Sequence, residues 1–371
     1  MTASLERRNY IKLIESEEMI HNRFKNIRAI NINGGDGYFS IVFVAYDIDC
    51  KNEVILKFFD PQKISYKDRL NRFYREADLL KKLISEERII GFIDGVNEHN
   101  VYVNKKGFEE EFEFPFRFLY YAMELADSDL YNVIYNNNLD ALERIIYFKE
   151  MVRAISCLHN RGICHRDLKL DNFLLKGKNV LLADLGTAKD SRVRSDNIYH
   201  DAIGELGFKS PESIFCIGIS DEYSIYSDIY MMGEILFEMF TLRRLVPEIS
   251  YVYESFEEKK DEMQRLKYDI RLREYRKFAD ELSRKFEFPN IFSYNDIVPK
   301  DIYSELNSLY QKLTTINLFN RLIKIDSIQR IVQICIIKLK NENKYQTNLA
   351  EQRRRRATRE FRKQRELNIQ R

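Results

Sequence analysis

The order of two residue patterns along the chain is the strongest constraint on its fold. Short runs of branched and aromatic residues, bounded by turn residues, fill the first third of the chain, at 27–33, 41–46, 54–59, 89–96 and 118–123. Runs of this kind predict β-strands. After residue 127, apolar residues recur at three- and four-residue steps, above all in 142–159 and 225–241, which predicts helices. Strands first and helices afterwards predict an α+β fold.

This order also predicts two lobes with a cleft between them. The main domain is expected over 28–340. The boundaries that we predict are a helical extension over 1–27, a β-rich N-lobe over 28–123 with one helix at 69–84, a hinge over 124–127, a helical C-lobe over 128–340 that includes a charged helical insertion at about 250–298, and a basic tail over 341–371.

Charge is unevenly placed along the chain. The formal net charge is +2, yet residues 351–371 contain nine Lys or Arg against three Glu, so the rest of the chain carries −4. A weakly acidic body does not suit a dedicated nucleic-acid binder. For the tail, an anionic partner (nucleic acid, a membrane surface or an acidic protein) and a solvated terminus both stay open. The oligomeric state is not determined by any sequence feature.

The five cysteines are widely spaced and form no CxxC pair, which argues against a disulfide framework and a zinc site. Reduced thiols are expected. The first 16 residues carry charges where a signal peptide needs an apolar stretch, and no apolar run approaches the ~18 residues of a membrane span. We therefore expect no transmembrane segment and a cytoplasmic location, or a nuclear one if the host has a nucleus.

A glycine-rich turn lies between two predicted strands. Gly35 and Gly37 would let backbone N–H groups approach phosphate oxygens closely. An ordinary hairpin turn explains the same glycines. The next strand makes the first interpretation sharper, because it places Lys57 among apolar residues. A buried ammonium requires an anionic partner, and Glu76 on the following helix is our candidate; a purely structural ion pair is the alternative.

The segment HRDLKLDN is the strongest chemical signal in the chain. It places a carboxylate, an ammonium and a carboxamide in one loop, at Asp167, Lys169 and Asn172. These groups can accept a hydroxyl proton, neutralise a transferring phosphoryl group and bind a hard cation. Asp184 follows an apolar run and would complete an oxygen-ligand magnesium site with Asn172.

With these motifs in place, the chain resembles the eukaryotic-type protein kinase superfamily from about residue 28 to about residue 339. The resemblance implies a bilobal fold, with a small antiparallel β-rich N-lobe that carries one key helix, a larger helical C-lobe and an ATP cleft between them. It implies ATP and Mg²⁺ as cofactors, with Mn²⁺ as the alternative ion, and a protein as substrate. Lys169 is the residue that serine/threonine kinases carry at this position.

The resemblance also implies residue roles. Asp167 would orient and deprotonate the acceptor hydroxyl, Lys169 would support the γ-phosphate, and Lys57 paired with Glu76 would complete the catalytic set. Asn172 and Asp184 would bind magnesium. The residues implied in nucleotide binding are Gly35, Gly37, Phe39, Val42, Lys57, Met123, Glu124, Ala126 and Asp129.

Two further motifs extend the resemblance beyond the catalytic loop. Ser210-Pro211-Glu212 matches the PE motif, whose glutamate is expected to pair with Arg321, and Asp228 resembles a buried helix aspartate that braces the catalytic loop. Through this resemblance, both motifs favour a protein kinase over a kinase of small molecules. A pseudokinase or scaffold is the other alternative, although no expected catalytic group is missing.

One departure from the family pattern concerns the segment between Asp184 and the PE motif. Glu205 stands where serine/threonine kinases normally carry a threonine, so it could pair with Lys169 or repel Asp167. Ser191 and Ser195 in the same segment are hypothesised phosphorylation sites that would pair with Arg166; the alternative is a loop that is ordered without modification. Tyr199 is the third hydroxyl in this segment.

Overall fold

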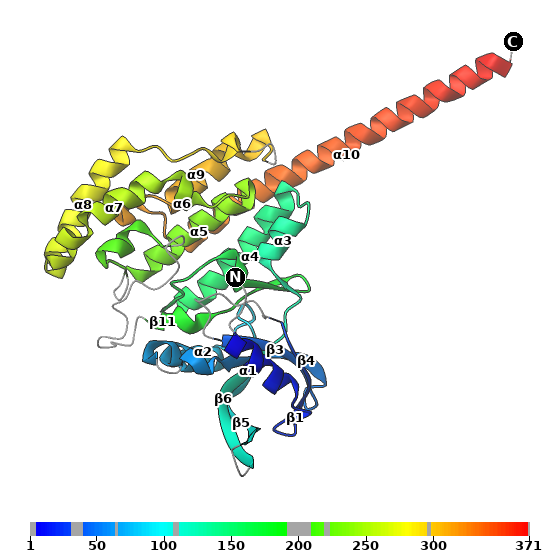
Figure 1. Ribbon diagram of the computed structural model, residues 1–371. Helices are drawn as coiled ribbons and strands as arrows, with labels where there is room; N and C mark the ends of the chain where they lie inside the picture. Colours follow the sequence, from blue (N-terminus) through cyan, green and yellow to red (C-terminus); the bar gives the residue numbers. More distant parts are fainter. Residues whose placement is uncertain are drawn as a thin grey trace. The chain divides into compact units, whose positions relative to one another are not determined.

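The computed structural model describes residues 5–30, 40–63, 66–106, 111–190, 209–218, 223–294 and 298–369 (Figure 1). The α+β fold is confirmed, because long strands occupy the described residues up to 124 and helices dominate after 129. The chain forms two compact units. The first contains Met1–Val133, Arg153–Lys209 and Cys216–Asp228, and the second contains Ile134–Val152, Ser210–Phe215 and Ile229–Arg371. The catalytic-loop motif therefore belongs to the same compact unit as the N-terminal strands.

The first unit is built on strands. Its elements are α1 (Leu5–Glu15), β1 (Met19–Ile20), β2 (Phe24–Ala29), β3 (Ser40–Asp47), β4 (Asn52–Phe59), η1 (Pro61–Lys63), α2 (Lys67–Lys82), β5 (Phe92–Lys106), β6 (Glu111–Glu124), β7 (Ser128–Asp129), β8 (Ile163–Cys164), η2 (Leu170–Asn172), β9 (Phe173–Lys176), β10 (Asn179–Leu182), η3 (Leu185–Thr187) and β11 (Lys189–Asp190). Helices α3 (Leu130–Asn136), α4 (Ala141–Asn160) and α5 (Ser224–Thr241) contribute residues to both units.

A six-stranded antiparallel sheet with the order β1-β2-β3-β4-β6-β5 forms the body of the first unit. Because side chains alternate along a strand, each strand supplies both faces. One face joins Ile11 and Ile14 of α1 to alternate residues of β3, β4 and β6 in a single apolar core. The other face meets α2, where Phe73 packs against Phe59 and Tyr121. The α2 face also carries Lys57.

The helical extension predicted over residues 1–27 ends earlier than expected. Helix α1 stops at Glu15, and the chain then turns through His21 and Asn22, which adopt φ angles of 50° and 54°. Two successive left-handed residues cannot continue an α-helix. Phe24, which lies within the predicted helical extension, is instead a fully buried residue of β2. The predicted boundary at residue 27 therefore lies within a strand.

The second unit is helical. Besides its parts of α3, α4 and α5, it contains η4 (Pro211–Phe215), α6 (Leu245–Glu248), α7 (Ser250–Arg265), α8 (Tyr268–Lys285), η5 (Ile291–Ser293), η6 (Lys300–Ile302), α9 (Tyr303–Leu313), η7 (Leu318–Asn320) and α10 (Ile325–Ile369). The predicted buried helix at 225–241 is confirmed as α5. A Cβ atom on its Gly233 would lie only 2.6 Å from Thr314 Cγ2 and 2.8 Å from Leu313 Cβ, so glycine permits α5 to approach the end of α9.

The charged stretch at about 250–298 forms the helices α7 and α8. They hold the end of η4 through an aromatic cluster in which Phe215 lies against Phe256, Tyr275 and Phe278. Arg271 also donates to the Phe215 carbonyl at 3.1 Å. The apolar faces of these helices are therefore used inside the second unit, while their charged faces remain exposed.

The last helix is longer than the sequence pattern predicted. We expected the helical C-lobe to end at residue 340 and a separate tail to follow, but α10 runs without interruption from Ile325 to Ile369 (Figure 1). Its apolar periodicity ends near Leu339, and residues beyond this point consist mainly of good helix formers that need no apolar partner. Among the described residues, no helix has both the length and the hydrophobicity needed to cross a membrane.

Candidate active site

Strand alternation in β4 determines where Lys57 points. Leu56 and Phe58 belong to the apolar core on the α1 side, so Lys57 between them faces α2. The strand register places Val42 of β3 and Tyr121 of β6 directly beside Lys57. Val42, which we predicted to contact nucleotide, therefore shares one sheet face with the strand lysine.

The predicted ion pair between Lys57 and Glu76 is confirmed. Glu76 lies on the buried face of α2 with Phe73 and Leu80, and its two carboxylate oxygens accept hydrogen bonds from Lys57 Nζ at 2.9 and 2.8 Å. The side chains are only 9% and 1% exposed. Burial acts to lower the pKa of Lys57, but the charges of Glu76 and Asp184 outweigh it and raise the pKa above its ordinary value. Lys57 is therefore a fixed cation.

Asp184 brings a second carboxylate to the same lysine. Its Oδ1 lies 3.6 Å from Lys57 Nζ, while 42% of its side chain remains exposed. Burial acts to raise the pKa of Asp184, but Lys57 and Lys169 lower it below its ordinary value, so the group is ionised. Asp184 has φ 58°, a sparsely populated conformation for a residue with a Cβ atom. The following η3 segment is held by Arg75 of α2, which donates to Gly186 O at 3.2 Å.

Asp228 holds the backbone of the catalytic loop, as predicted. This fully buried carboxylate accepts hydrogen bonds from the backbone N–H of His165 at 2.8 Å and of Arg166 at 2.7 Å. His159 Nε2 donates a third bond at 2.9 Å. Burial acts to raise the pKa of Asp228, but these donors lower it below its ordinary value. The contacts fix Arg166 at φ 71°, which directs the next residue, Asp167.

His165 connects the loop to the segment before Asp184. Its Nε2 donates to Ala183 O at 3.0 Å, and its Nδ1 accepts from the backbone N–H of Asp167 at 3.3 Å. Thr187 adds a hydroxyl bond to His165 O at 3.0 Å. His159, His165 and Thr187 were missed by the sequence reasoning, because their roles depend on distant carbonyl and carboxylate groups.

Asn172 ties the two predicted metal-binding positions together. Its backbone carbonyl accepts from Ala183 N at 2.9 Å, so Asn172 lies beside the residue before Asp184. Its Nδ2 donates to Asp167 O at 2.7 Å. Since the amide nitrogen is engaged, Oδ1 is the atom that can serve a cation. This oxygen and the ionised Asp184 carboxylate are the ligand types that Mg²⁺ prefers, so the residues fit the ion.

Lys169 precedes η2 in extended backbone conformation and is half-buried. Its carbonyl accepts from Asn172 N at 3.1 Å, and its charge contributes to the low pKa of Asp184. The catalytic loop thus brings together Asp167, Lys169 and Asn172, which the sequence had placed in one motif.

The predicted hinge begins where β6 ends. Met123 and Glu124 are the last residues of β6 and Ala126 follows, all three partly buried. Glu124 N donates to Gly91 O at 2.8 Å, and the Glu124 side chain contacts Lys176. Asp129, predicted to meet the ribose, has both carboxylate oxygens engaged at 2.7 Å by the backbone and side-chain nitrogens of Asn132. In this structure Asp129 therefore caps α3.

Several predicted positions lie outside the described residues. These are Gly35, Gly37 and Phe39 of the glycine-rich turn, together with Ser191, Ser195, Tyr199 and Glu205. Their predicted roles stay predictions. All five cysteines are free in the structure. In the residues that the structure describes, no group of three His, Cys, Asp or Glu side chains could hold a metal ion.

The predicted pair between Glu212 and Arg321 is also confirmed. Arg321 Nη1 and Nη2 donate to the two Glu212 oxygens at 2.6 and 3.0 Å, with both side chains almost completely buried. The guanidinium also lies 4.9 Å from the centre of the Tyr230 ring. This pair fixes the PE segment within the second unit.

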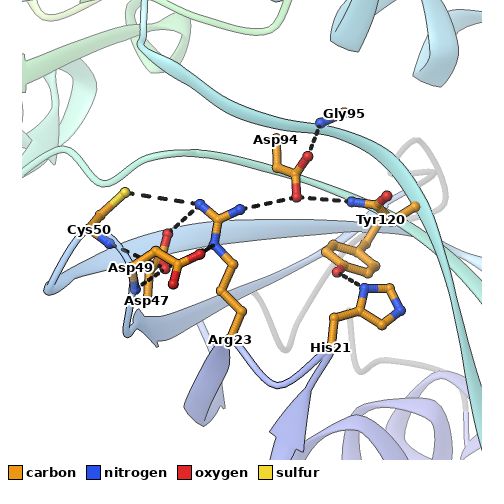
Figure 2. Close-up of polar contacts among 9 residues, drawn as sticks. His21, Arg23, Asp47, Asp49, Cys50, Asp94, Gly95 and Tyr120 are labelled. Carbon is orange, nitrogen blue, oxygen red and sulfur yellow. Dashed lines mark hydrogen bonds and ion pairs between the residues drawn. The ribbon is translucent and has the colours of Figure 1, made fainter.

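An additional charged cluster near the end of β3 was not predicted. Arg23 donates to both oxygens of Asp47 at 2.9 and 2.8 Å and also contacts Asp49 and Asp94 (Figure 2). Beside it, Tyr120 and His21 share a hydrogen bond of 2.6 Å. The cluster joins the turn after β3 to β5 and contains none of the predicted catalytic residues.

Comparisons with known proteins agree with the site. A family model described as "protein kinase domain" matches residues 31–343. Among curated proteins, the chain is 30% identical over 240 residues to the stress-activated protein kinase JNK of Drosophila melanogaster, covering 64% of this chain and 58% of that protein. It is 28% identical over 236 residues to the serine/threonine-protein kinase ICK of Mus musculus, covering 62% and 33%.

A plant protein gives a similar result. The chain is 29% identical over 207 residues to the CBL-interacting serine/threonine-protein kinase 15 of Arabidopsis thaliana, covering 55% of this chain and 44% of that protein. The matched region thus spans between 33% and 58% of the length of these three relatives.

Proposed function

Because this chain belongs to the protein kinase family, we propose that it transfers the γ-phosphoryl group of ATP to serine or threonine hydroxyls of protein substrates. The observation that carries the proposal is the arrangement around Lys57, in which Glu76 and Asp184 hold one fixed cation and the catalytic loop adjoins Asp184. The names of the relatives, which are serine/threonine kinases, support the acceptor class.

In this proposal each side chain has a separate task. Asp167 accepts the proton of the attacking hydroxyl, whose oxygen bonds to the γ-phosphorus while the bond to the bridging oxygen of ADP breaks. Lys57, kept cationic by Glu76, positions phosphate oxygens. Lys169 neutralises charge that develops on the transferred group.

Magnesium would be held by Asn172 Oδ1 and the Asp184 carboxylate, and when bound it neutralises negative charge on the phosphate oxygens. The surroundings of these two ligands set their charge and orientation. Asp184 is ionised at neutral pH because its pKa lies below the ordinary value. The Asn172 amide is oriented by its bond to Asp167 O. Asp228 holds the loop backbone, so few groups need to reorganise during the reaction.

The test is transfer of labelled phosphate from ATP, in the presence of magnesium, to a generic protein acceptor. Wild-type protein should label serine or threonine, with turnover on the order of 1–100 per second on a good substrate. Asp184→Asn should remove the label, because it removes the negative charge from the two proposed magnesium ligands and leaves only neutral amides. Asp171→Asn is the matched control, since Asp171 is an exposed carboxylate in the same loop and should leave activity unchanged.

Three results would contradict the proposal in different ways. Equal labelling by wild type and Asp184→Asn would show that the label does not come from this site. No labelling, with nucleotide binding retained, would favour a pseudokinase or scaffold. Transfer to a small alcohol but to no protein would favour a small-molecule kinase.

A further inference from the structure

Two cavities adjoin along the hinge segment, 124–127. One, of about 480 Å³, is bordered by the β3–β4 turn and the start of β5. The other, of about 600 Å³, is bordered by the β9–β10 turn. They share Glu124, Asp127 and Lys176, so they form one continuous surface within the first unit. We call this surface the hinge groove. None of the catalytic-loop residues lines it.

The floor of the hinge groove is apolar. Five apolar side chains line it, two of them buried and three partly exposed: Val54, Leu181, Phe92, Ile93 and Leu125. Partly exposed apolar side chains at the bottom of a concave surface favour a ligand that also buries apolar area. The hinge groove therefore suits a ligand with apolar groups better than it suits a simple ion.

The rim of the hinge groove is acidic. Four carboxylates line the two cavities, from Glu53, Glu87, Glu124 and Asp127, and Glu53 is paired with Arg28 at 2.8 Å. Lys176 adds one ammonium to this lining. That ammonium already contacts Glu124. Glu87 is exposed and makes no hydrogen bond or ion pair within the described part of the chain. An excess of carboxylates attracts a cationic ligand and repels phosphates and nucleic acids.

The walls of the hinge groove are fixed before any ligand binds. Cys50 lines one end, and the Arg23 cluster in Figure 2 connects its turn to Asp94 of β5. At the other end, Gly177 N donates to Asp127 Oδ2 at 2.6 Å, and Asp127 N donates to Leu175 O at 2.8 Å. A preformed surface loses little conformational entropy when it binds a partner.

We propose that the hinge groove binds a basic linear segment of a partner protein, with arginine or lysine side chains at the acidic rim and apolar side chains on the floor. An arginine reaches a rim carboxylate in bidentate geometry, and an intervening leucine-like side chain covers Phe92 and Ile93. Neither contact involves the catalytic loop, Lys57 or Asp184, although the rim also contains Glu124, one of the residues implied in nucleotide binding. The proposal therefore does not depend on the proposed kinase activity.

The test measures fluorescence anisotropy of labelled peptides with the full chain in the absence of nucleotide. The main probe alternates arginine and leucine; the comparison probes alternate glutamate with leucine and arginine with glycine. The groove variant carries Glu53→Lys and Glu87→Lys. Its matched control carries Asp261→Lys and Glu262→Lys, two exposed carboxylates of α7 in the second unit, with the same change in net charge. Circular dichroism and thermal unfolding establish that both variants are folded.

We expect the arginine–leucine peptide to bind the wild type and the control variant equally. Binding to the groove variant should weaken by about tenfold or more, and added salt should weaken the wild-type complex. The arginine–glycine peptide should bind more weakly than the arginine–leucine peptide, and the glutamate–leucine peptide should not bind.

Three outcomes would overturn the proposal. Equal binding to the groove and control variants would show attraction to the general surface charge. Equal affinity for the two arginine peptides would exclude a role of the apolar floor. A fourth probe, the peptide 351–371 of this chain, tests a different occupant. If it alone binds and loses affinity in the groove variant, the occupant is the chain's own basic segment and not a partner protein.

Discussion

Two buried ion pairs, one in each unit, have similar geometry but different surroundings. Glu212 and Arg321 are 1% and 0% exposed, and the guanidinium also donates to the Thr315 carbonyl and lies over the Tyr230 ring. Lys57 and Glu76 are almost as buried, but Asp184 approaches the same lysine with 42% of its side chain exposed. A closed pair can only support the fold. In the open triad, two carboxylates share one ammonium, so one negative charge is left to interact with a charged ligand. This uncompensated charge makes the triad less favourable for stability than a balanced pair.

The largest expected effect tests the closed pair. Replacing the guanidinium by Arg321→Met should lower the free energy of unfolding by about 3–5 kcal/mol, because Glu212 is left as an uncompensated buried charge. Urea denaturation measures the change. The double variant Glu212→Gln/Arg321→Met should recover much of the loss. A loss below about 1 kcal/mol in the single variant would mean that water or another group reaches Glu212.

The open triad should respond mainly in activity. Lys57→Met should reduce phosphoryl transfer by about 10²–10³-fold, equivalent to about 3–4 kcal/mol of transition-state stabilisation. Its effect on unfolding should be smaller than that of Arg321→Met, since Glu76 can accept a proton beside Tyr121. The assay is labelled-phosphate transfer with urea denaturation in parallel.

A double variant separates the two contributions of Lys57. Lys57→Met/Glu76→Gln removes the stranded carboxylate, so stability should recover while activity stays low. If activity recovered with stability, Lys57 would act only as a structural partner, and the contrast between the two pairs would disappear.

The Arg23 cluster is intermediate in exposure, with side chains of Arg23 and Asp47 that are 23% and 0% exposed. Its contribution to stability can be tested by changing the pH. Burial acts to raise the pKa of Asp47, but hydrogen bonds from Arg23 outweigh it and lower the pKa to about 2, against 3.8 ordinarily. A carboxyl group with a lowered pKa stabilises the fold above its ordinary pKa, and this contribution is lost as the pH falls toward 2. It amounts to about 2 kcal/mol.

Free energies of unfolding measured from pH 6 down to pH 2 provide the check. Asp47→Asn should give a shallower decline between about pH 4 and pH 2 than wild type. The control is Asp49→Asn, which changes an exposed partner of the same arginine. Parallel declines for wild type and Asp47→Asn would place the acid sensitivity elsewhere.

The smallest effect is expected for an exposed pair. Glu281 and Lys285 lie one helical turn apart on α8, with side chains 65% and 62% exposed. Glu281→Gln should leave thermal unfolding and phosphoryl transfer unchanged, because solvent screens the pair. A clear loss of stability would show that exposure alone does not separate structural from dispensable ion pairs in this chain.

The sequence was sufficient where the signal is local. Helices α4 and α5 followed from apolar spacing, and the groups of the catalytic loop occur within one short segment. Long-range pairs such as Glu212 and Arg321 were predicted only through the family resemblance, since their separation carries no periodic signal. The early end of the predicted helical extension was missed, because the local sequence does not reveal that Met19 and Ile20 pair with β2 as a strand.

The sequence by itself determined which chemical groups this chain possesses: a lysine in an apolar strand, three polar groups in one loop and an aspartate after a buried strand. Only the tertiary structure decided their environment. Because side chains alternate along β4, Lys57 points toward α2. The buried Asp228 carboxylate accepts hydrogen bonds from the His159 side chain and from the backbone N–H groups of His165 and Arg166. Ionisation depends on burial and on nearby charges in space, so residues distant in sequence decide which carboxylates are closed within the fold and which stay open to a ligand.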